Sequence, residues 1–413
     1  MKTIVVRNPA GAIALEAAPS SILVGGAGGE ELASAVAEET TVTVEDLSET
    51  ERAELDASPE FLTASPMKLR LIRPVPADGP DAGAQAEHDA FVENDASGNR
   101  TAWGVLAIGA AGSQLTGRDV PVAVLDTGID KAHPAFDGVD LIRENFTDES
   151  DDDTDGHGTH CAGTIFGRDV AGIRIGVARG VTRAFIAKVI PAGSDALIAA
   201  LNWAAQQGAR VASMSLGYDF PDWVRELRDE HGIPEPAAIS MALRDFRANI
   251  ASFDALMGLF RAQALAGGGM VVIAASGNES ERTLPPPRRP YTISASPPSA
   301  ANGVIAVGAL GRSAAGLRVA EFSNTSPQLA APGVGILSAL AGTQGLVAEN
   351  GTSMACPHVA GLAALYWDQG LHGVGGAPGP DAIVNRLIGR AQTARLAPGF
   401  TRGDVGEGLP VAP

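Results

Sequence analysis

Three short glycine-rich segments carry an Asp, a His and a Ser in a fixed order. VAVLDTGID at 122–130 contains Asp126, DGHGTHCAGT at 155–164 contains His157, and GTSMACPHVAG at 351–361 contains Ser353. A serine hydroxyl is a weak nucleophile unless a base lies within hydrogen-bond reach, and a carboxylate must fix the tautomer of that base and stabilise its cation. The three residue types therefore indicate nucleophilic catalysis by Ser353, with His157 as the base and Asp126 as its partner.

Three other interpretations of these residues are a zinc site, a helix N-cap serine and an α/β-hydrolase nucleophile. His157, His160 and Cys161 could share a helix face as zinc ligands, but a fourth ligand at suitable spacing is missing, because Cys356 lies in the serine motif instead. Ser353 alone could be an ordinary helix N-cap. Its GTS context also differs from the G-x-S-x-G elbow, which argues against a lipase or esterase of the α/β-hydrolase type.

Two further segments extend this pattern into a resemblance. The three motifs are similar to the active-site signatures of the subtilases, the subtilisin-like serine proteases of peptidase family S8. VVIAASGNES at 271–280 resembles the oxyanion-hole strand of that family, and ASMSLG at 212–217 resembles its substrate-binding strand. The resemblance runs from about Trp103 to the C-terminus, and the HGTHC variant is similar to the proteinase K and thermitase branches. It implies a three-layer α/β fold with a mainly parallel central sheet, and a serine endopeptidase that forms an acyl-enzyme.

The resemblance also assigns roles to single residues. Asn278 would donate its amide to the oxyanion of the tetrahedral intermediate, beside the Asp126, His157 and Ser353 triad. Ala275, Ser276 and Gly277 would line one side of the pocket for the residue before the cleaved bond, and because they are small, a medium or large apolar side chain is expected to fit there. Glu279, near the mouth of that pocket, would also admit Lys or Arg. The expected substrate-binding residues are Ser215, Leu216, Gly217, Ala275, Ser276, Gly277 and Ser296.

An acidic run, DESDDDTD at 148–155, leads directly into the histidine motif. It is expected to be a solvated loop, with calcium binding as the alternative because clustered carboxylates suit a hard cation. The calcium site that the family resemblance implies is expected to be absent, since Ala135 and Val170 stand where that site needs polar ligands. No metal or other cofactor is expected at the active site.

Composition and charge narrow the possible partners. The chain has 413 residues and a formal net charge of −18, which argues against nucleic acids and anionic membranes as partners and mildly favours basic substrates. No apolar run of about 18 residues is present to span a membrane. The first residues do not form a proper signal peptide, and the two cysteines do not form a disulfide framework. These features favour a cytoplasmic location, with export without a leader as the alternative.

The chain divides into three parts. Residues 1–73 are expected to form a small α+β unit, 74–101 a polar linker rich in Pro, Gly, Ala and Asp, and 102–413 the catalytic domain. In the last part, continuous apolar β-branched runs alternate with helical segments, as in a parallel sheet covered on both faces. Ligands of such sheets bind beyond the carboxyl ends of the strands, where Asp126 and Asn278 arrive.

The small unit is predicted to have strands at 3–6 and 41–45, a helix that starts with a Ser48–Glu51 capping box, and an extended segment at 61–72. The stretch 44–66 loosely resembles subtilase propeptides, which are folding chaperones and inhibitors; an unrelated accessory domain is the alternative. On the propeptide interpretation, the extended segment would lie in the substrate groove until the linker is cut between Pro74 and Ala102.

Residues 218–268 form an unusually long connection after the SMSLG strand. Their apolar residues have helical spacing and predict one long helix or a helical pair. Extra scaffold packing and a wall of the substrate cleft are the two possible roles. For the whole chain, the alternative to a peptidase is a subtilase fold that has lost catalysis and acts as a binding or regulatory protein.

Overall fold

A mainly parallel sheet brings the catalytic motifs to one edge. The computed structural model describes residues 2–10, 13, 39–75, 89–218, 220–265, 268–373 and 378–413. Its central sheet has the strand order β14-β13-β12-β10-β7-β9-β8, with β15 pairing β13, and the β13–β14 pair is antiparallel while the other pairs are parallel. The strands are β7 (Val122–Asp126), β8 (Asp140–Asn145), β9 (Arg183–Lys188), β10 (Val211–Met214), β12 (Val271–Ala275), β13 (Val304–Ser313), β14 (Gly316–Val319) and β15 (Leu329–Pro332).

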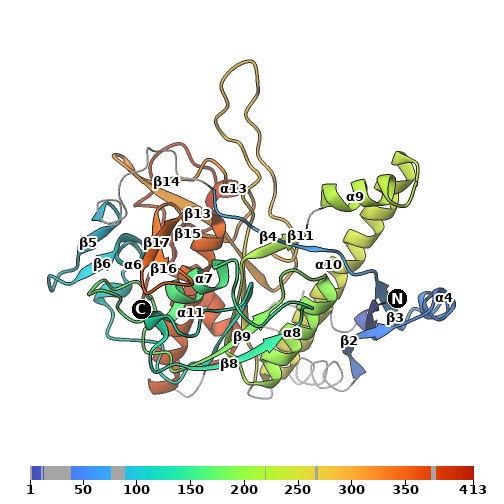
Figure 1. The fold of residues 1–413 in the computed structure, drawn as a ribbon, viewed down its shortest axis with the longest axis horizontal. Coiled ribbons are helices and arrows are strands. Elements are labelled where there is room, and N and C mark those ends of the chain that lie inside the picture. Colours follow the sequence, from blue (N-terminus) through green and yellow to red (C-terminus); the bar gives the residue numbers. More distant parts are fainter. Residues whose placement is uncertain are drawn as a thin grey trace.

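Helices cover both faces of this sheet, as predicted. Along β7, Val122 and Val124 pack into one buried cluster, whereas Ala123 and Leu125 pack into another. This alternation follows from the two-residue period of a strand, and it divides the core into two layers around the sheet. The first cluster contains α7 (His157–Phe166), α11 (Thr352–His372) and α12 (Pro380–Gly389); the second contains α8 (Ser194–Gln206) and α10 (Glu235–Leu265). Figure 1 shows the resulting three-layer α/β fold.

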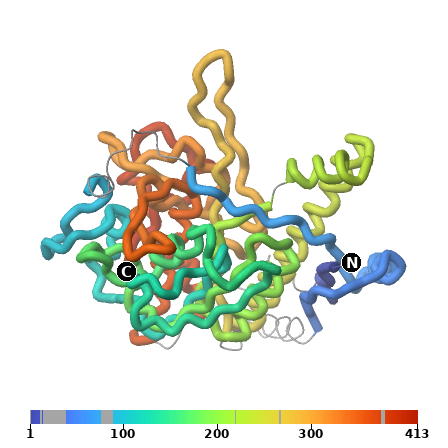
Figure 2. The backbone as a smooth tube through the Cα atoms, viewed as in Figure 1, coloured from blue at the N-terminus to red at the C-terminus, as the bar shows by residue number. Residues whose placement is uncertain are grey.

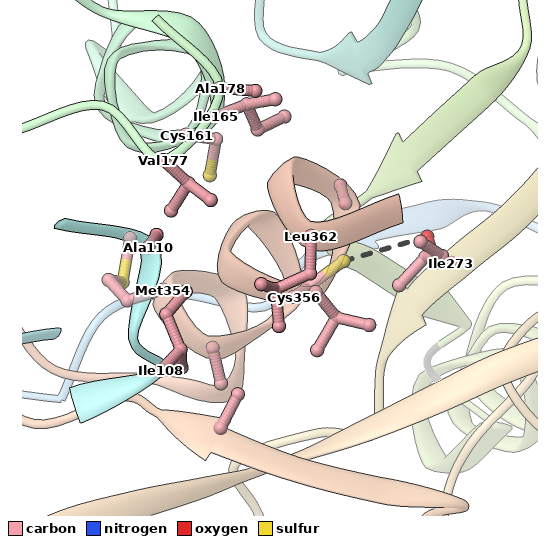
Figure 3. Packing of buried hydrophobic residues seen from close by; sticks show 14 of the residues in the cluster. Ile108, Ala110, Cys161, Ile165, Val177, Ala178, Ile273, Met354, Cys356 and Leu362 are labelled. Atoms are coloured by element: carbon pink, nitrogen blue, oxygen red, sulfur yellow. Dashed lines mark hydrogen bonds between the residues drawn. The ribbon is translucent and has the colours of Figure 1, made fainter. Parts of the chain in front are cut away.

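Helix α11 runs through the interior rather than over the surface. Its residues Met354, Cys356 and Leu362 pack in the same cluster as Cys161 of α7, as Figure 3 shows. The Cys356 thiol points to the carbonyl of Ile273 on β12 at 3.5 Å. Because the helix is held on all sides, the residues of its first turn are placed rigidly.

The N-terminal residues form a separate three-stranded antiparallel sheet with the order β2-β1-β3. Its elements are β1 (Lys2–Arg7), β2 (Thr41–Asp46), α4 (Glu49–Asp56) and β3 (Phe61–Ala64). The predicted strands are confirmed, and Ser48 and Glu51 make the predicted capping box. The inner face of β1, with Ile4 and Val6, belongs to the same buried cluster as α8 and α10. The small sheet is therefore docked on the large unit.

Downstream of this sheet, the chain crosses the large unit in extended form. Strand β4 (Leu69–Leu71) pairs antiparallel with β11 (Leu216–Tyr218), in the register Leu71 with Leu216 and Arg70 with Gly217. Figure 2 shows this segment as a single blue path from the small sheet across the catalytic unit. The pairing joins residues that are far apart in the sequence.

Residues 89–101 differ from the predicted linker. They form a hairpin of β5 (Val92–Asn94) and β6 (Arg100–Ala102), followed by α6 (Trp103–Ala107). The hairpin is packed because the Phe91 ring lies against Gly335 and the Trp103 indole N–H donates to the Gly335 carbonyl at 2.9 Å. The rest of the predicted linker, residues 76–88, lies outside the described residues.

The long connection after β11 folds into a helical pair, as predicted. Helix α9 (Phe220–Asp229) and α10 pack together, and both contact the N-terminal segment. Lys68 pairs with Glu226 of α9 at 2.8 Å, and the Asn249 amide of α10 donates to the Ser65 carbonyl at 2.8 Å. The helical pair α9–α10, hereafter the insertion, therefore contacts and supports the N-terminal segment just before it pairs with β11.

Smaller elements complete the described fold. They are β16 (Ile336–Ala339), β17 (Leu346–Glu349), α13 (Arg402–Val405) and the 3-10 turns at Ala110–Gly112 and Pro134–Phe136. Among the residues that the structure describes, we find no helix with the length and apolar character needed to cross a membrane.

Candidate active site

Asp126 and His157 meet at the carboxyl edge of the sheet. Asp126 is the last residue of β7, and His157 is the first residue of α7. The His157 Nδ1 and Asp126 Oδ1 atoms are 2.8 Å apart, and both side chains are buried. Gly158 permits this approach, because a Cβ there would clash with the Gly128 carbonyl and lie 3.2 Å from the Asp126 Cβ.

The Asp126 carboxylate controls the protonation of the imidazole. Burial by itself would lower the pKa of His157, but the charge of Asp126 and their hydrogen bond outweigh it, so the pKa is raised well above its usual range. Asp126 Oδ1 also accepts the Thr127 backbone N–H at 2.8 Å, which fixes the carboxylate. His157 is thus held as a base whose cation is strongly stabilised.

Ser353 is the second residue of α11, and its hydroxyl faces the N-terminal segment. Ser353 Oγ donates to the Ile72 carbonyl at 2.7 Å, while His157 Nε2 is buried without a hydrogen-bond partner among the described residues. The Ser353 carbonyl accepts from Ser215 Oγ at 3.1 Å and from the Cys161 thiol at 3.4 Å. The structure thus joins Asp126 to His157, but the serine hydroxyl is engaged by the chain's own backbone.

Asn278 lies beyond the end of β12 and faces the same segment. Its Oδ1 accepts from the Thr352 backbone N–H at 2.9 Å and from Thr352 Oγ1 at 2.8 Å, so its Nδ2 is turned to the groove. Nδ2 donates to the Arg73 carbonyl at 3.0 Å. Thr352, which orients this amide, is not among the site residues predicted from the sequence, although its place directly before Ser353 is a usable signal.

The expected substrate-binding residues surround the N-terminal segment. The Ile72 N–H donates to the Ser215 carbonyl at 3.3 Å, which continues the pairing of β4 with Leu216 and Gly217. A Cβ at Gly217 would lie 2.9 Å from Ser296 Oγ and 3.8 Å from Ile72 Cδ1. The Ile72 side chain therefore lies beside Gly217 and close to Ser296, in one wall of the expected substrate pocket.

The opposite wall is formed by the last residue of β12 and the segment that follows it. The Ser276 carbonyl accepts the Ser296 N–H at 3.3 Å, which joins this segment to Ser296. Three expected residues are buried here: Ala275, Ser276 and Gly277. Six of the seven expected substrate-binding positions thus lie on two segments, 215–217 and 275–277, and the seventh, Ser296, contacts both of them.

The acidic run is held by hydrogen bonds to neighbouring groups. The Asp153 carboxylate accepts from Thr127 Oγ1 at 2.8 Å, from the Gly156 N–H at 2.8 Å and from Thr159 Oγ1 at 2.6 Å. Lys188 Nζ donates to the carbonyls of Ser150 and Asp152 at 2.8 and 2.9 Å. Asp153 thus joins the loop after β7 to the start of α7, a role that the sequence did not predict.

The zinc alternative is not supported by these contacts. His160 turns away, with its Nε2 3.0 Å from the Ile336 carbonyl. In the described part of the chain, one group of possible metal ligands lies within 4.8 Å, namely Asp126, His157 and Cys161. Burial raises the pKa of the Cys161 thiol, which favours the neutral form over a metal-binding thiolate.

The comparison with known families agrees with this arrangement. A model of the subtilase family matches residues 117–374, more than half of the chain, including Asp126, His157, Asn278 and Ser353. The chain belongs to the subtilase family.

Curated relatives have serine protease names. A cuticle-degrading serine protease of Arthrobotrys oligospora is 31% identical over 68% of this chain and 59% of its own length. The major intracellular serine protease of Bacillus subtilis is 34% identical over 61% of this chain and 69% of its own. An intracellular serine protease of Paenibacillus polymyxa is 33% identical over 62% and 69%, respectively. The matches therefore span 59–69% of the length of these three serine proteases.

Proposed function

We propose that this subtilase is a serine endopeptidase, with Ser353 as nucleophile, His157 as general base, Asp126 as its charge-stabilising partner and Asn278 as an oxyanion donor. One observation carries the proposal. An extended polypeptide, residues 69–73, lies antiparallel to β11, with its backbone carbonyls at Ser353 Oγ and Asn278 Nδ2. A groove that binds a peptide backbone in this way can present a peptide bond to the nucleophile.

The proposed reaction needs only these side chains and the Ser353 backbone N–H, so we propose that it uses no metal or other cofactor. Ser353 Oγ would attack the substrate carbonyl carbon while its proton passes to His157 Nε2. Asn278 Nδ2 and the Ser353 N–H would stabilise the oxyanion. On collapse, the imidazolium would give its proton to the departing amine and leave an acyl-enzyme. Water would then add by the same path, releasing the acid product and restoring the Ser353 hydroxyl.

We also propose that residues 1–73 act as an intramolecular inhibitor of this site. The apolar side chains of the crossing segment are buried in the groove, with Leu69, Leu71 and Ile72 between 2% and 8% exposed. The Leu69 N–H donates to the Ala192 carbonyl at 2.9 Å, so the backbone of the segment is also held on the edge that faces away from β11. A substrate would have to displace all of these contacts.

The register of the segment supports inhibition rather than turnover. Ser353 donates its hydrogen to the oxygen of the Ile72 carbonyl, and Asn278 donates to the following carbonyl, that of Arg73. In an attacking complex, the hydroxyl would donate to His157 Nε2, and the oxygen of the attacked carbonyl would face Asn278. With the segment bound, the nucleophile's hydrogen goes to the Ile72 carbonyl and His157 Nε2 receives none.

Activation would follow cleavage between Pro74 and Ala102, in the connection to the hairpin at 89–102. The experiment compares wild type with Ser353→Ala by mass spectrometry and by labelling with a fluorophosphonate probe. The wild-type chain should be cut within 74–102 and become labelled, and Ser353→Ala should do neither. A wild-type chain that is never labelled, even after the connection is cut by an added protease, would favour the catalytically silent binding protein instead.

We propose a cytoplasmic location for this activity. Two relatives have "intracellular" in their names, and both cysteines of this chain are free and buried, as suits a reducing compartment. Fractionation of the producing cells tests this proposal, with the enzyme in the culture medium as the contrary result.

A further inference from the structure

An apolar groove beside β11 is not used by the mechanism described above. It has a volume of about 470 Å³ and lies between the inserted helices and the turn that precedes Ser296. Tyr218, Leu243, Phe246 and Ile293 supply its apolar wall, and Arg70 and Glu279 lie at its polar end. Phe246 is buttressed by Phe220, whose ring packs edge-on at 5.6 Å. Since Leu243 and Phe246 come from α10, the insertion builds this wall.

Glu279 is held in place at the polar end of the groove. One of its carboxylate oxygens, Oε2, accepts from the Asn324 amide at 2.6 Å, while the Asn324 oxygen accepts the backbone N–H groups of Glu279 and Ser280, both at 3.1 Å. The same Asn324 amide lies 3.1 Å from the Ser276 carbonyl, in the wall beside Ile72. The second carboxylate oxygen, Oε1, is thereby directed to the groove, where it contacts the Arg70 guanidinium.

The position of Arg70 can be counted from the nucleophile. Ile72 lies against Gly217, and its carbonyl accepts from Ser353 Oγ. It therefore occupies the place of the substrate residue directly before the cleaved peptide bond. Leu71 is then the second position and Arg70 the third. The side chains of Arg70 and Leu71 point to opposite faces of β4, with Leu71 buried and Arg70 directed to Glu279.

We propose that Glu279 and the α10 wall form a subsite for a cationic side chain, Arg or Lys, at the third residue before the cleaved bond of a polypeptide substrate. The proposal rests on the endopeptidase activity proposed above. A long cationic side chain fits both parts of this site, because its alkyl stem covers apolar surface while its charged end reaches a carboxylate. The sequence places this carboxylate near the mouth of the pocket for the first residue, and its Oε2 does lie close to Gly277 in the wall of that pocket. Its Oε1 contacts Arg70, at the third position, and that contact extends the expected role to a second subsite.

The experiment measures kcat/KM of the full-length chain on three internally quenched peptides with the core Leu-X-Leu-Ile, where X is Arg, its neutral isostere citrulline, or Glu. Ratios between peptides on one enzyme preparation do not depend on the fraction of chains whose groove is open. The Arg peptide should be preferred over citrulline by about fivefold, as for a partly exposed ion pair, with Glu the poorest. Glu279→Gln should bring the Arg-to-citrulline ratio close to one, and Glu279→Arg should favour Glu.

Glu281→Gln is the matched control. The Glu281 carboxylate is two residues from Glu279 and pairs with Tyr291 and Arg288. The Glu281→Gln substitution therefore removes the same charge without changing a residue that lines the groove. The control should keep the wild-type ratio. Equal hydrolysis of the Arg and citrulline peptides by wild type, or a ratio that Glu279→Gln and Glu281→Gln change equally, overturns the subsite and leaves the endopeptidase intact. Hydrolysis of none of the peptides, even after the connection at 74–102 is cut, overturns the endopeptidase and the subsite with it.

Discussion

Replacing Ile72 with alanine should release the proposed inhibition without removing any catalytic group. The Ile72 side chain is 2% exposed and lies 3.8 Å from the position a Cβ would take at Gly217. Truncating a buried Ile to Ala costs about 2–5 kcal/mol in a folded core. The lower end applies here, because water can refill a groove that opens at the surface. A loss of about 2 kcal/mol raises the open fraction of the groove by roughly 30-fold.

The assay measures the initial rate at which a fluorophosphonate labels Ser353. Only the labelled chain of full length is counted, so that chains already cut do not contribute. Ile72→Ala should be labelled roughly 30-fold faster than wild type, since the probe reacts only with chains whose groove is open. Ile173→Ala is the control, because its side chain is equally buried but lies in the turn at 170–173. Labelling of Ile72→Ala at the wild-type rate would refute the inhibitory contact.

The other predictions concern the catalytic groups. Ser353→Ala and His157→Ala should each lower peptidase activity by several orders of magnitude, and the double variant should lose little more, because the residues act as a unit. The value of kcat/KM should fall as the pH drops through the raised pKa of His157, since the base must be neutral, and a rate that stays flat as the medium is acidified would contradict this role. Asn278→Ala should lower kcat by about 10²–10³-fold, the loss known for such a donor in subtilisin, with little change in KM; an unchanged kcat would exclude the oxyanion role.

The catalytic edge could be predicted from the sequence because its chemistry requires particular residue types in local motifs. Asp126 ends a continuous apolar strand, and His157 and Ser353 each precede a helical apolar pattern, so the secondary structure alone brings them to one edge of a parallel sheet. The same logic placed Asn278 after β12. These predictions depend on short segments whose conformations are set locally.

Other features depend on contacts between distant segments and could not be read from local pattern. Residues 89–101 are polar and rich in turn formers, yet Phe91 anchors them through a glycine more than 200 residues away. The acidic run is mostly exposed, as expected of a solvated loop, but Asp153 within it is half-buried and accepts hydrogen bonds from Thr127, after β7, and Thr159, in α7. The register of β4 on β11 joins residues almost 150 positions apart, which no local pattern specifies. Glu279 is directed to Arg70 by Asn324, which no motif marks.

The docking of the N-terminal sheet bears on how the proposed inhibition would end. Residues 69–73 are tethered to a sheet whose apolar face, with Ile4 and Val6, is buried against α8 and α10. A tethered segment competes with substrate at an effective concentration of roughly millimolar, far above that of a typical peptide substrate. Cutting the connection after Pro74 removes one covalent link but leaves this apolar contact and the β4–β11 pairing in place. Cleavage would therefore make inhibition reversible without ending it at once, and full activity would require the small unit to dissociate or to be degraded.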